Sequence, residues 1–134
     1  MKEINVEVIT PAKKAYEDKA LSITIPGTKG SFQVLFNHAP LLSSFEIGKI
    51  KIVDSNNKTH IFATGGGTSE VRENNVLILA ESFEAVEKID VQRAENALNR
   101  AKERLAHKDD HSIDVKRAEL ALKRAMNRLK LAHK

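Results

Sequence analysis

The sequence contains no cysteine, so it can form neither a disulfide framework nor a thiolate zinc site. It also has no tryptophan, one tyrosine and five phenylalanines, which leaves aliphatic side chains to build any hydrophobic core. No apolar run approaches the ~18 residues of a membrane span, and residues 1–10 alternate in polarity instead of forming the apolar core of a signal peptide. We therefore expect a protein of a cytoplasm-like compartment that is not itself inserted into a membrane.

The charge of the chain is unevenly distributed. The net charge of the 134 residues is +4, with 41% hydrophobic and 30% charged residues, a composition typical of a globular protein. Residues 1–88 hold 10 Lys and Arg against 11 Asp and Glu, whereas residues 89–134 hold 12 against 7 and contain six of the seven arginines. This asymmetry favours an anionic partner for the C-terminal segment, such as a nucleotide, a nucleic acid or an acidic protein surface. A solvated helical face explains the charge equally well.

The first part of the chain has the two-residue period of β-strands. The segments that alternate, or that are bounded by turn signals, are 3–9, 20–25, 31–36, 45–53, 59–64, 68–73 and 76–81. We expect residues 37–42 to form a loop or strand edge, Asn74-Asn75 to form a hairpin turn, and Gly65–Gly67 to cause a break or a close backbone approach. The continuous apolar run Val76–Leu79 predicts a strand buried on both faces. Together these short strands predict a β-sandwich or flattened barrel.

The C-terminal part is built from a repeat. Residues 89–105 (IDVQRAENALNRAKERL) and 113–129 (IDVKRAELALKRAMNRL) match at 12 of 17 positions. Asp90 and Asp114 suit the N-cap or first turn of a helix, where a carboxylate meets free backbone N–H groups. The apolar positions of each copy follow a 3-4 spacing in which larger residues alternate with alanine: Val91, Ala94, Leu98, Ala101 and Leu105, then Val115, Ala118, Leu122, Ala125 and Leu129.

This pattern predicts an antiparallel two-helix hairpin, with helices at about 89–107 and 112–132 and a seam that lets the helices approach closely. Residues 83–88 read as a polar connector. The chain is therefore predicted to be α+β, with a β-sandwich domain at 1–85 and a helical hairpin at 86–134. Because half of the seam is alanine, little apolar area is buried, and we expect a weakly held hairpin that a ligand or partner can stabilise or open.

Several motifs resemble those of one known family. Asn37-His38-Ala39-Pro40-Leu41 is similar to a G-H-x-P-L loop, with Asn in place of the first Gly, and Gly65–Gly67 followed by Glu70-Val71-Arg72 is similar to G-G-F-x-E-V-R. Residues 89–94 fit I/L-D-x-x-R-A, and residues 117–122 fit the second helix of the same family. By the order and spacing of these motifs, nearly the whole chain resembles the epsilon subunit of bacterial F-type ATP synthases.

The resemblance implies a place in the central rotary stalk of a proton-translocating ATP synthase, as a peripheral, non-catalytic subunit at the cytoplasmic face of the bacterial cell membrane. It implies that the sandwich binds the gamma subunit and the ring of c subunits, and that the hairpin inhibits ATP hydrolysis when it extends. The basic helices would then meet an acidic segment of the beta and alpha subunits. The interface residues that the resemblance implies are Ser31, Phe32, His38, Ala39 and Pro40.

The resemblance also implies that the folded hairpin binds a regulatory ATP without hydrolysing it. The residues carried over to this role are Glu84, Ile89, Asp90, Arg93, Ala94, Arg100, Arg124 and Arg128. The chemistry agrees, because guanidinium groups form forked hydrogen bonds to phosphate oxygens, while Asp90 and Glu84 can accept from adenine or ribose donors.

Two other functions are compatible with the residues alone. One is a free-standing nucleotide-sensing module, and the other is a nucleic-acid-binding protein whose basic hairpin holds phosphates. The basic segment lacks the aromatic side chains that usually stack on single-stranded bases, so we expect no nucleic-acid partner. His107 and His111 lie in a polar linker, and no residue pattern indicates a metal site or a catalytic centre, so we expect neither a catalytic cofactor nor catalysis by this chain alone.

Overall fold

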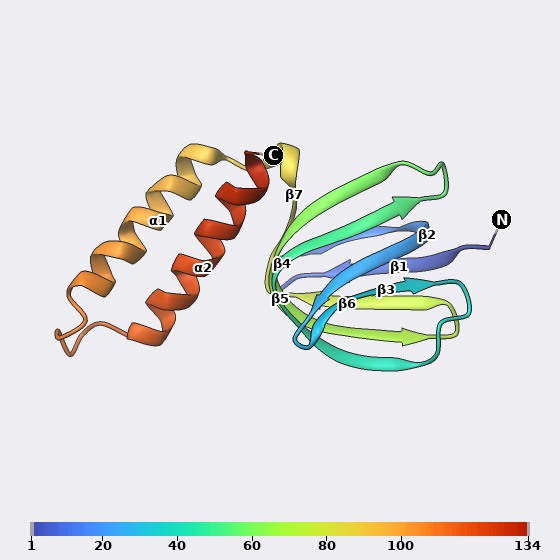
Figure 1. The fold of residues 1–134 in the computed structure, drawn as a ribbon, viewed down its shortest axis with the longest axis horizontal. Coiled ribbons are helices and arrows are strands. Elements are labelled where there is room, and N and C mark those ends of the chain that lie inside the picture. The colour runs from blue at the N-terminus through green and yellow to red at the C-terminus, as the bar shows by residue number, and fades with distance from the viewer. Residues whose placement is uncertain (1, 134) are drawn as a thin grey trace. The chain divides into compact units, whose positions relative to one another are not determined.

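The computed structural model describes residues 2–133 and divides the chain into two compact units, Met1–Ala85 and Val86–Lys134 (Figure 1). The strands of the first unit are β1 (Ile4–Ile9), β2 (Lys14–Gly27), β3 (Gly30–Leu35), β4 (Leu41–Asp54), β5 (Thr59–Arg72), β6 (Asn75–Ala80) and β7 (Phe83–Ala85). The second unit contains the 3-10 turn η1 (Val86–Lys88) and the helices α1 (Val91–Ala106) and α2 (Val115–Ala132).

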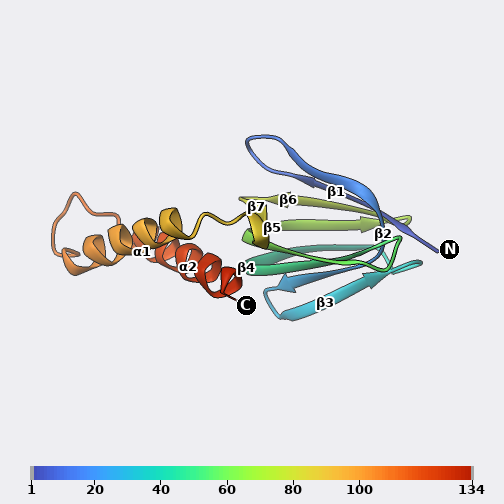
Figure 2. The same cartoon turned by 90° about the horizontal axis from the view of Figure 1, so that it is seen from above.

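The strands of the first unit form one seven-stranded sheet that closes on itself. Their order is β1-β6-β5-β4-β2-β3, and β7 pairs with β5. An additional pairing between β1 and β2 closes the sheet and leaves β3 beyond the closure, where among the described strands it pairs only with β2. Figure 2 shows the strands in two facing layers, with β1 and β6 on one side and β3 and β4 on the other. The predicted fold class, a flattened β-barrel or sandwich followed by a helical hairpin, is confirmed.

The barrel core is aliphatic, as the scarcity of aromatic residues predicts. Its fully buried large side chains alternate along the strands and comprise Ile4, Val6, Val8, Ile23, Ile25, Val34, Ile50, Ile52, Val71, Val76 and Ile78. Because successive side chains of a strand point to opposite faces, this alternation places one face of each strand against the core. The alternation seen in the sequence is therefore the direct cause of the barrel.

The segment Gly65–Gly67 lies inside strand β5 and does not break it. Residues before it pair with β7, and residues from Gly67 onward pair with β6, so β5 changes its neighbour at this point. Gly66 has a φ of 94°, which favours glycine, and a Cβ built on Gly67 would lie 1.9 Å from the carbonyl oxygen of Leu79. Of the two predicted outcomes, the close backbone approach is confirmed and the break is wrong.

Replacing Gly67 with alanine is expected to destabilise the barrel by about 2 kcal/mol, because the new methyl group forces strands β5 and β6 apart. Urea denaturation of the variant measures this loss. Gly30→Ala is the matched control: a Cβ there meets nothing within 4 Å, and only its φ of 118° is unfavourable, so the expected loss is about 1 kcal/mol. Equal stability of Gly67→Ala and the wild type would contradict the close approach.

Other sequence-based boundaries need correction. Strand β2 begins at Lys14, not at residue 20, because its polar first half pairs with β1. Strand β4 already begins at Leu41, inside the predicted loop 37–42. The hairpin turn between β5 and β6 is Glu73-Asn74, both with positive φ, and Asn75 belongs to β6.

Two further predictions about strands are wrong. Strand β6 is not buried on both faces, because Val76 and Ile78 are buried while Leu79 is 47% exposed. Residues 83–88 are not only a connector, because Phe83–Ala85 forms the short strand β7 against β5. The pairing of β7 depends on contacts distant in sequence, which no local pattern reveals.

A histidine–aspartate pair lies beside the hairpin between β4 and β5. Nε2 of His60 lies 2.8 Å from one oxygen of Asp54, whose other oxygen accepts hydrogen bonds from the backbone N–H groups of Asn56 and Lys58, each at 2.9 Å. The hydrogen bond with His60, followed by that from the Lys58 backbone, lowers the pKa of Asp54. These contacts tie the hairpin together while Asp54 is ionised.

A lowered pKa in the folded state predicts acid sensitivity. The stabilisation by Asp54 is complete above about pH 5 and is lost as the pH falls through the folded-state pKa, because the unfolded chain binds the proton more readily. The urea midpoint of the barrel should fall between about pH 5 and pH 2, and we expect this fall to be smaller in the Asp54→Asn variant. Identical pH slopes for the two proteins would show that Asp54 does not contribute.

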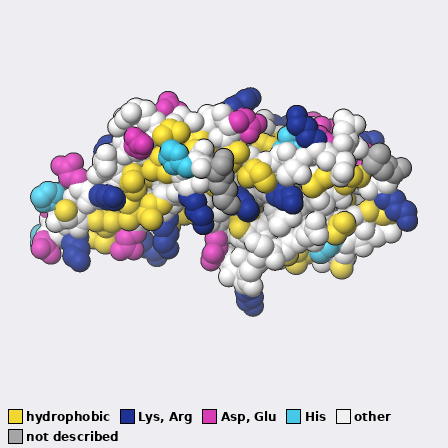
Figure 3. All heavy atoms as spheres, turned by 45° about the horizontal axis from the view of Figure 1, so that its top comes forward, with side chains coloured by type: hydrophobic (Ala, Val, Ile, Leu, Met, Phe, Trp, Pro, Cys, Tyr) yellow, Lys and Arg dark blue, Asp and Glu magenta, His cyan; other side chains and the backbone are white. Residues whose placement is uncertain are grey.

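The second unit is the predicted helical hairpin. Asp90 and Asp114 are the N-caps of α1 and α2, and their side chains accept from the backbone N–H of Arg93 and Arg117 at 3.1 and 3.0 Å. The deeply buried seam residues are the alanines Ala94, Ala101, Ala118 and Ala125, whereas the larger seam residues are half-buried. Figure 3 accordingly shows yellow hydrophobic side chains at the surface of the hairpin, beside dark blue basic ones. The small seam permits close packing but buries little apolar area.

Candidate functional site

The six arginines of the second unit share one face of the hairpin. With about 100° of rotation per residue, Arg93, Arg100 and Arg104 fall within about 40° of one another around α1, about 120° from the seam. Arg117, Arg124 and Arg128 occupy the equivalent positions of α2 in the second copy of the sequence repeat. We call these six residues the arginine face.

The two arginine stripes lie on the same side because the helices are antiparallel (Figure 1). Two similar antiparallel helices are related by a two-fold axis normal to the plane that contains both helices. Rotation about this axis places equivalent residues of the two helices on the same side of that plane. The link between them is residues 107–114. Arg93 and Arg128 are equally far from the link in sequence, one before its start and the other after its end. They therefore lie opposite one another. By the same count Arg104 and Arg117, each three residues from the link, form the other end of the face.

The lysines of the helices follow a different flank. Lys116, Lys123 and Lys130 lie about 100–140° from the seam of α2 in the opposite sense, away from the arginine face. Basic residues are thus sorted by type around the hairpin. Arginine offers a planar fork of donors that suits phosphate and carboxylate, so this sorting points to an anion on the arginine face.

Four of the residues predicted to bind ATP belong to this face. They are Arg93 and Arg100, which are exposed, and Arg124 and Arg128, which are half-buried. Arg124 and Arg128 are one turn apart on α2, and Arg93 is opposite Arg128. The structure therefore brings the predicted phosphate-binding arginines together.

The other four predicted residues have different positions. Asp90 is exposed and caps α1, Ile89 is 9% exposed just before it, and Ala94 is fully buried in the helix seam. Ala94 therefore acts by letting the helices approach and does not present a side chain to the arginine face. Glu84 is half-buried in β7 of the first unit, where it pairs with Ala63 of β5.

The predicted interface residues of the barrel lie along β3, which is the last strand of the sheet path. Ser31 and the half-buried Phe32 are at its start, whereas His38, Ala39 and Pro40 follow its end. The strand spans about 13 Å from Ser31 to Leu35 at about 3.3 Å per residue, and the His38 backbone N–H donates to the Leu35 carbonyl oxygen at 3.1 Å, so a partner that covers both groups extends along the whole strand. The His38 ring nitrogen Nδ1 lies 2.7 Å from the carbonyl oxygen of Ala39.

The loop after β3 is anchored to the neighbouring hairpin. Asn37 has a φ of 64°, a conformation that asparagine tolerates better than most residues and glycine best. This explains how asparagine can stand where the similar G-H-x-P-L loop has glycine. The backbone N–H of Asn37 donates to the side-chain oxygen of Asn74 at 2.6 Å, which links the loop to the turn between β5 and β6.

An aromatic cluster at β7 was not predicted. Phe83 stacks on Phe62 with ring centroids 4.2 Å apart, and Tyr16 of β2 meets both rings edge-on at 5.6 and 6.3 Å. Burial is the main cause that raises the pKa of Tyr16. The cluster fixes β7 to the barrel and so fixes the position of Glu84, the next residue after Phe83.

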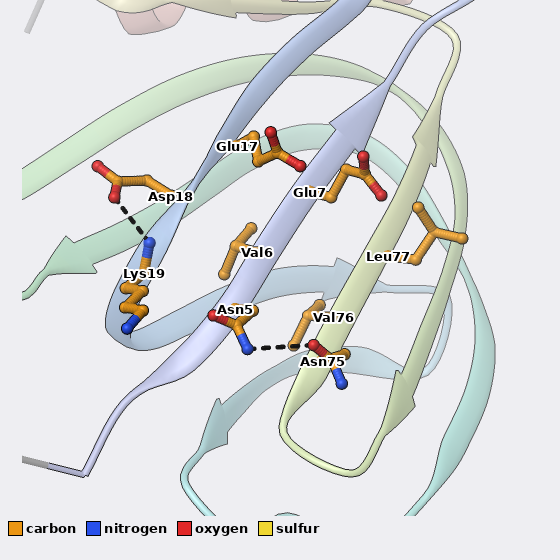
Figure 4. Close-up of a pocket in the computed structure, with 9 residues that line it drawn as sticks. All are labelled: Asn5, Val6, Glu7, Glu17, Asp18, Lys19, Asn75, Val76 and Leu77. Atoms are coloured by element: carbon orange, nitrogen blue, oxygen red, sulfur yellow. Dashed lines mark hydrogen bonds between the residues drawn. The ribbon is translucent and has the colours of Figure 1, made fainter.

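A hollow of about 460 Å³ lies where β1, β2 and β6 meet (Figure 4). Its lining includes Glu7 and Glu17, and both carboxylates contact Nζ of Lys14, at 3.0 and 3.3 Å. The hydrogen bond to Glu7, then that to Glu17, raises the pKa of Lys14. None of the predicted site residues lines this hollow, and its acidic charge is partly neutralised by Lys14.

The chain is a two-domain protein, with a closed β-barrel followed by a basic helical hairpin that carries the arginine face. Residues 3–86 match the family description "ATP synthase, Delta/Epsilon chain, beta-sandwich domain", and residues 87–133 match "ATP synthase, Delta/Epsilon chain, long alpha-helix domain". The chain therefore belongs to the ATP synthase delta/epsilon chain family.

Individual relatives agree with this assignment. The chain is 48% identical over 103 residues to the ATP synthase epsilon chain of Pelotomaculum thermopropionicum, covering 77% of this chain and 76% of the relative. It is 40% identical over 114 residues to that of Nitratidesulfovibrio vulgaris, covering 83% and 84%. The fold is similar, with a TM-score of 0.81 at 20% identity, to a chain of the Euglena gracilis mitochondrial ATP synthase structure, covering 100% of this chain and 83% of that one.

In the described part of the chain, none of the helices is long and apolar enough to cross a membrane. Among the same residues, no group of three or more His, Asp or Glu side chains is arranged to hold a metal ion.

Proposed function

We propose that this chain is the epsilon subunit of the central stalk of a proton-translocating ATP synthase. Its barrel binds the gamma subunit and the c ring, and its hairpin restrains ATP hydrolysis by meeting an acidic segment of the beta and alpha subunits. The subunit itself is not catalytic and sits peripherally at the cytoplasmic face of the cell membrane. Family membership over residues 3–133 supports this proposal.

The observation that carries the regulatory part is the arginine face on a hairpin with an alanine seam. The seam buries mainly methyl groups, so the packing energy of α1 against α2 is small. A partner or ligand that contacts the arginines competes only against this small energy. Opposite charge on the partner would steer association and fix its register.

We further propose that ATP binds the hairpin at Arg93, Arg124 and Arg128, with Arg100 beside them. Guanidinium groups from both helices on one triphosphate hold the hairpin closed. A ligand that binds only the closed hairpin stabilises that state by about 2.7 kcal/mol when the free ligand concentration is about 100 times its Kd. That is sufficient to reverse the equilibrium of a marginal two-helix element.

Titration of the full chain with ATP, followed by amide NMR shifts and calorimetry, tests this site. We expect saturable shifts in residues 84–94 and 124–128 and no release of phosphate. The absence of saturable shifts in these residues would refute the ATP site. Co-purification with a gamma-type coiled-coil protein tests the place in the stalk, whereas ATP binding without any such partner would favour a free-standing nucleotide-sensing module.

A further inference from the structure

The motif at the start of α1 occurs a second time at the start of α2. Ile113-Asp114-x-x-Arg117-Ala118 repeats Ile89-Asp90-x-x-Arg93-Ala94. The two caps also have the same geometry, with φ and ψ of −84° and 98° at Asp114 and of −80° and 99° at Asp90. The repeat therefore reproduces the local structure and not only the residue types.

The two-fold relation of the helices places this second motif at the link end of the arginine face. Arg104 and Arg117 lie opposite one another, each three residues from the link, and Arg100 is one turn from Arg104 on the same stripe. All three side chains are exposed. They are the counterparts of Arg128, Arg93 and Arg124 at the other end of the hairpin.

Such clustering of like charge is unfavourable without an anion. Arg100 and Arg104 are like charges at i and i+4, an arrangement that destabilises a helix. Glu95 and Glu119 are on the flank opposite the arginines, whereas Glu103, three residues after Arg100, is its neighbour on the helix surface and offsets part of this repulsion.

Two of the carboxylates in the link are engaged in local hydrogen bonds. Asp110 accepts hydrogen bonds from the backbone N–H and hydroxyl of Ser112, at 2.9 and 2.8 Å, which lower its pKa. The other link residues that bear or can bear charge are all exposed: His107, Lys108, Asp109, His111 and the N-cap Asp114. Three link carboxylates, Asp109, Asp110 and Asp114, therefore lie near the three arginines and Lys108, and Asp114 already accepts the backbone N–H of Arg117.

We propose that Arg100, Arg104 and Arg117 form a second anion site at the link end of the hairpin, which binds small polyphosphates without selecting a base. Forked guanidinium donors from two helices match the oxygens of a di- or triphosphate. Lys108 of the link adds a further cation at this end. Guanidinium and ammonium groups only donate hydrogen bonds, so these arginines and Lys108 contact phosphate oxygens and do not read the adenine amino group.

Titration of the full chain with tripolyphosphate, followed by amide NMR shifts, tests the site. We expect saturable shifts in residues 100–104 and 113–118. The variant Arg104→Gln/Arg117→Gln is expected to reduce the affinity for tripolyphosphate, measured from these shifts, at least about tenfold, because charged hydrogen bonds are lost. Lys123→Gln/Lys130→Gln removes the same charge from the other flank and is expected to change affinity by no more than about twofold.

The outcomes separate this site from the ATP site. ATP, GTP and tripolyphosphate are expected to bind the link end with similar affinity, whereas only ATP shifts residues 84–94 strongly. If the shifts at 84–94 are absent and those at 113–118 persist, the ATP site fails and the second site stands. If the link-end shifts are absent or do not saturate, or if the lysine variant loses as much affinity as the arginine variant, the second site is refuted.

Two controls accompany these variants. Circular dichroism shows whether the arginine variant keeps its helices. Arg104→Lys/Arg117→Lys, which keeps the charge, is expected to recover part of the affinity.

Discussion

Removal of residues 89–134 is expected to abolish the restraint on ATP hydrolysis and to leave a folded, gamma-binding barrel. The first compact unit ends at Ala85, and its core is complete without the helices. Strand β7 stays in place through its pairing with β5 and the stack of Phe83 on Phe62. The measurement is the ATPase rate of a matching F1 complex reconstituted with the full or the shortened chain.

A second truncation provides the control. Removal of residues 83–134 also deletes β7 and the half-buried Phe83 ring, so the barrel should lose about 2 kcal/mol of stability, less than a fully buried phenylalanine would cost. Comparing the two shortened chains by urea denaturation shows where the barrel ends. An unfolded 1–88 chain would place the domain boundary elsewhere, and unchanged hydrolysis with a bound 1–88 barrel would remove the hairpin from regulation.

The local patterns of the sequence predict much of this fold because they report local physics. The alternation around Ile4 and Val8 specifies a strand with one buried face, and Asp90 and Asp114 specify helix starts by accepting from N–H groups that the helix leaves open. The seam of both helices follows from the 3-4 spacing. These features need only neighbours within a few residues.

The features that sequence did not predict depend on distant pairing. The first half of β2 is polar, and it becomes a strand because β1 offers it a partner. Gly67 continues β5 because β6 lies close beside it. Likewise Glu84 belongs to a strand only through the stack of Phe83 on Phe62.

The candidate site divides in the same way. The arginine face follows from the sequence repeat and the helical period, so its residues can be selected from the sequence alone. The burial of Ala94, which removes its side chain from the face, cannot be distinguished in the sequence from a ligand contact.

Replacing Arg124 and Arg128 with glutamine is expected to weaken ATP binding at least about 100-fold. Each charged hydrogen bond to a phosphate contributes about 1.5–3 kcal/mol, and about 1.4 kcal/mol corresponds to a tenfold change in affinity. The two arginines are one turn apart on α2 and half-buried, so water screens them less than the exposed arginines of α1. The amide NMR shifts of residues 84–94 during an ATP titration measure this change separately from binding at the link end.

The matched control is Lys123→Gln/Lys130→Gln, which lowers the charge of α2 by the same amount on the opposite flank. If general electrostatic attraction held the nucleotide, both variants would lose affinity equally and the ATP site would be refuted. If forked hydrogen bonds hold it, the lysine variant keeps its affinity, and Arg124→Lys/Arg128→Lys is intermediate because it retains charge but not the fork. With tripolyphosphate in place of ATP, the Arg124→Gln/Arg128→Gln variant should still show the shifts of residues 113–118, because that end of the hairpin is built from Arg104 and Arg117.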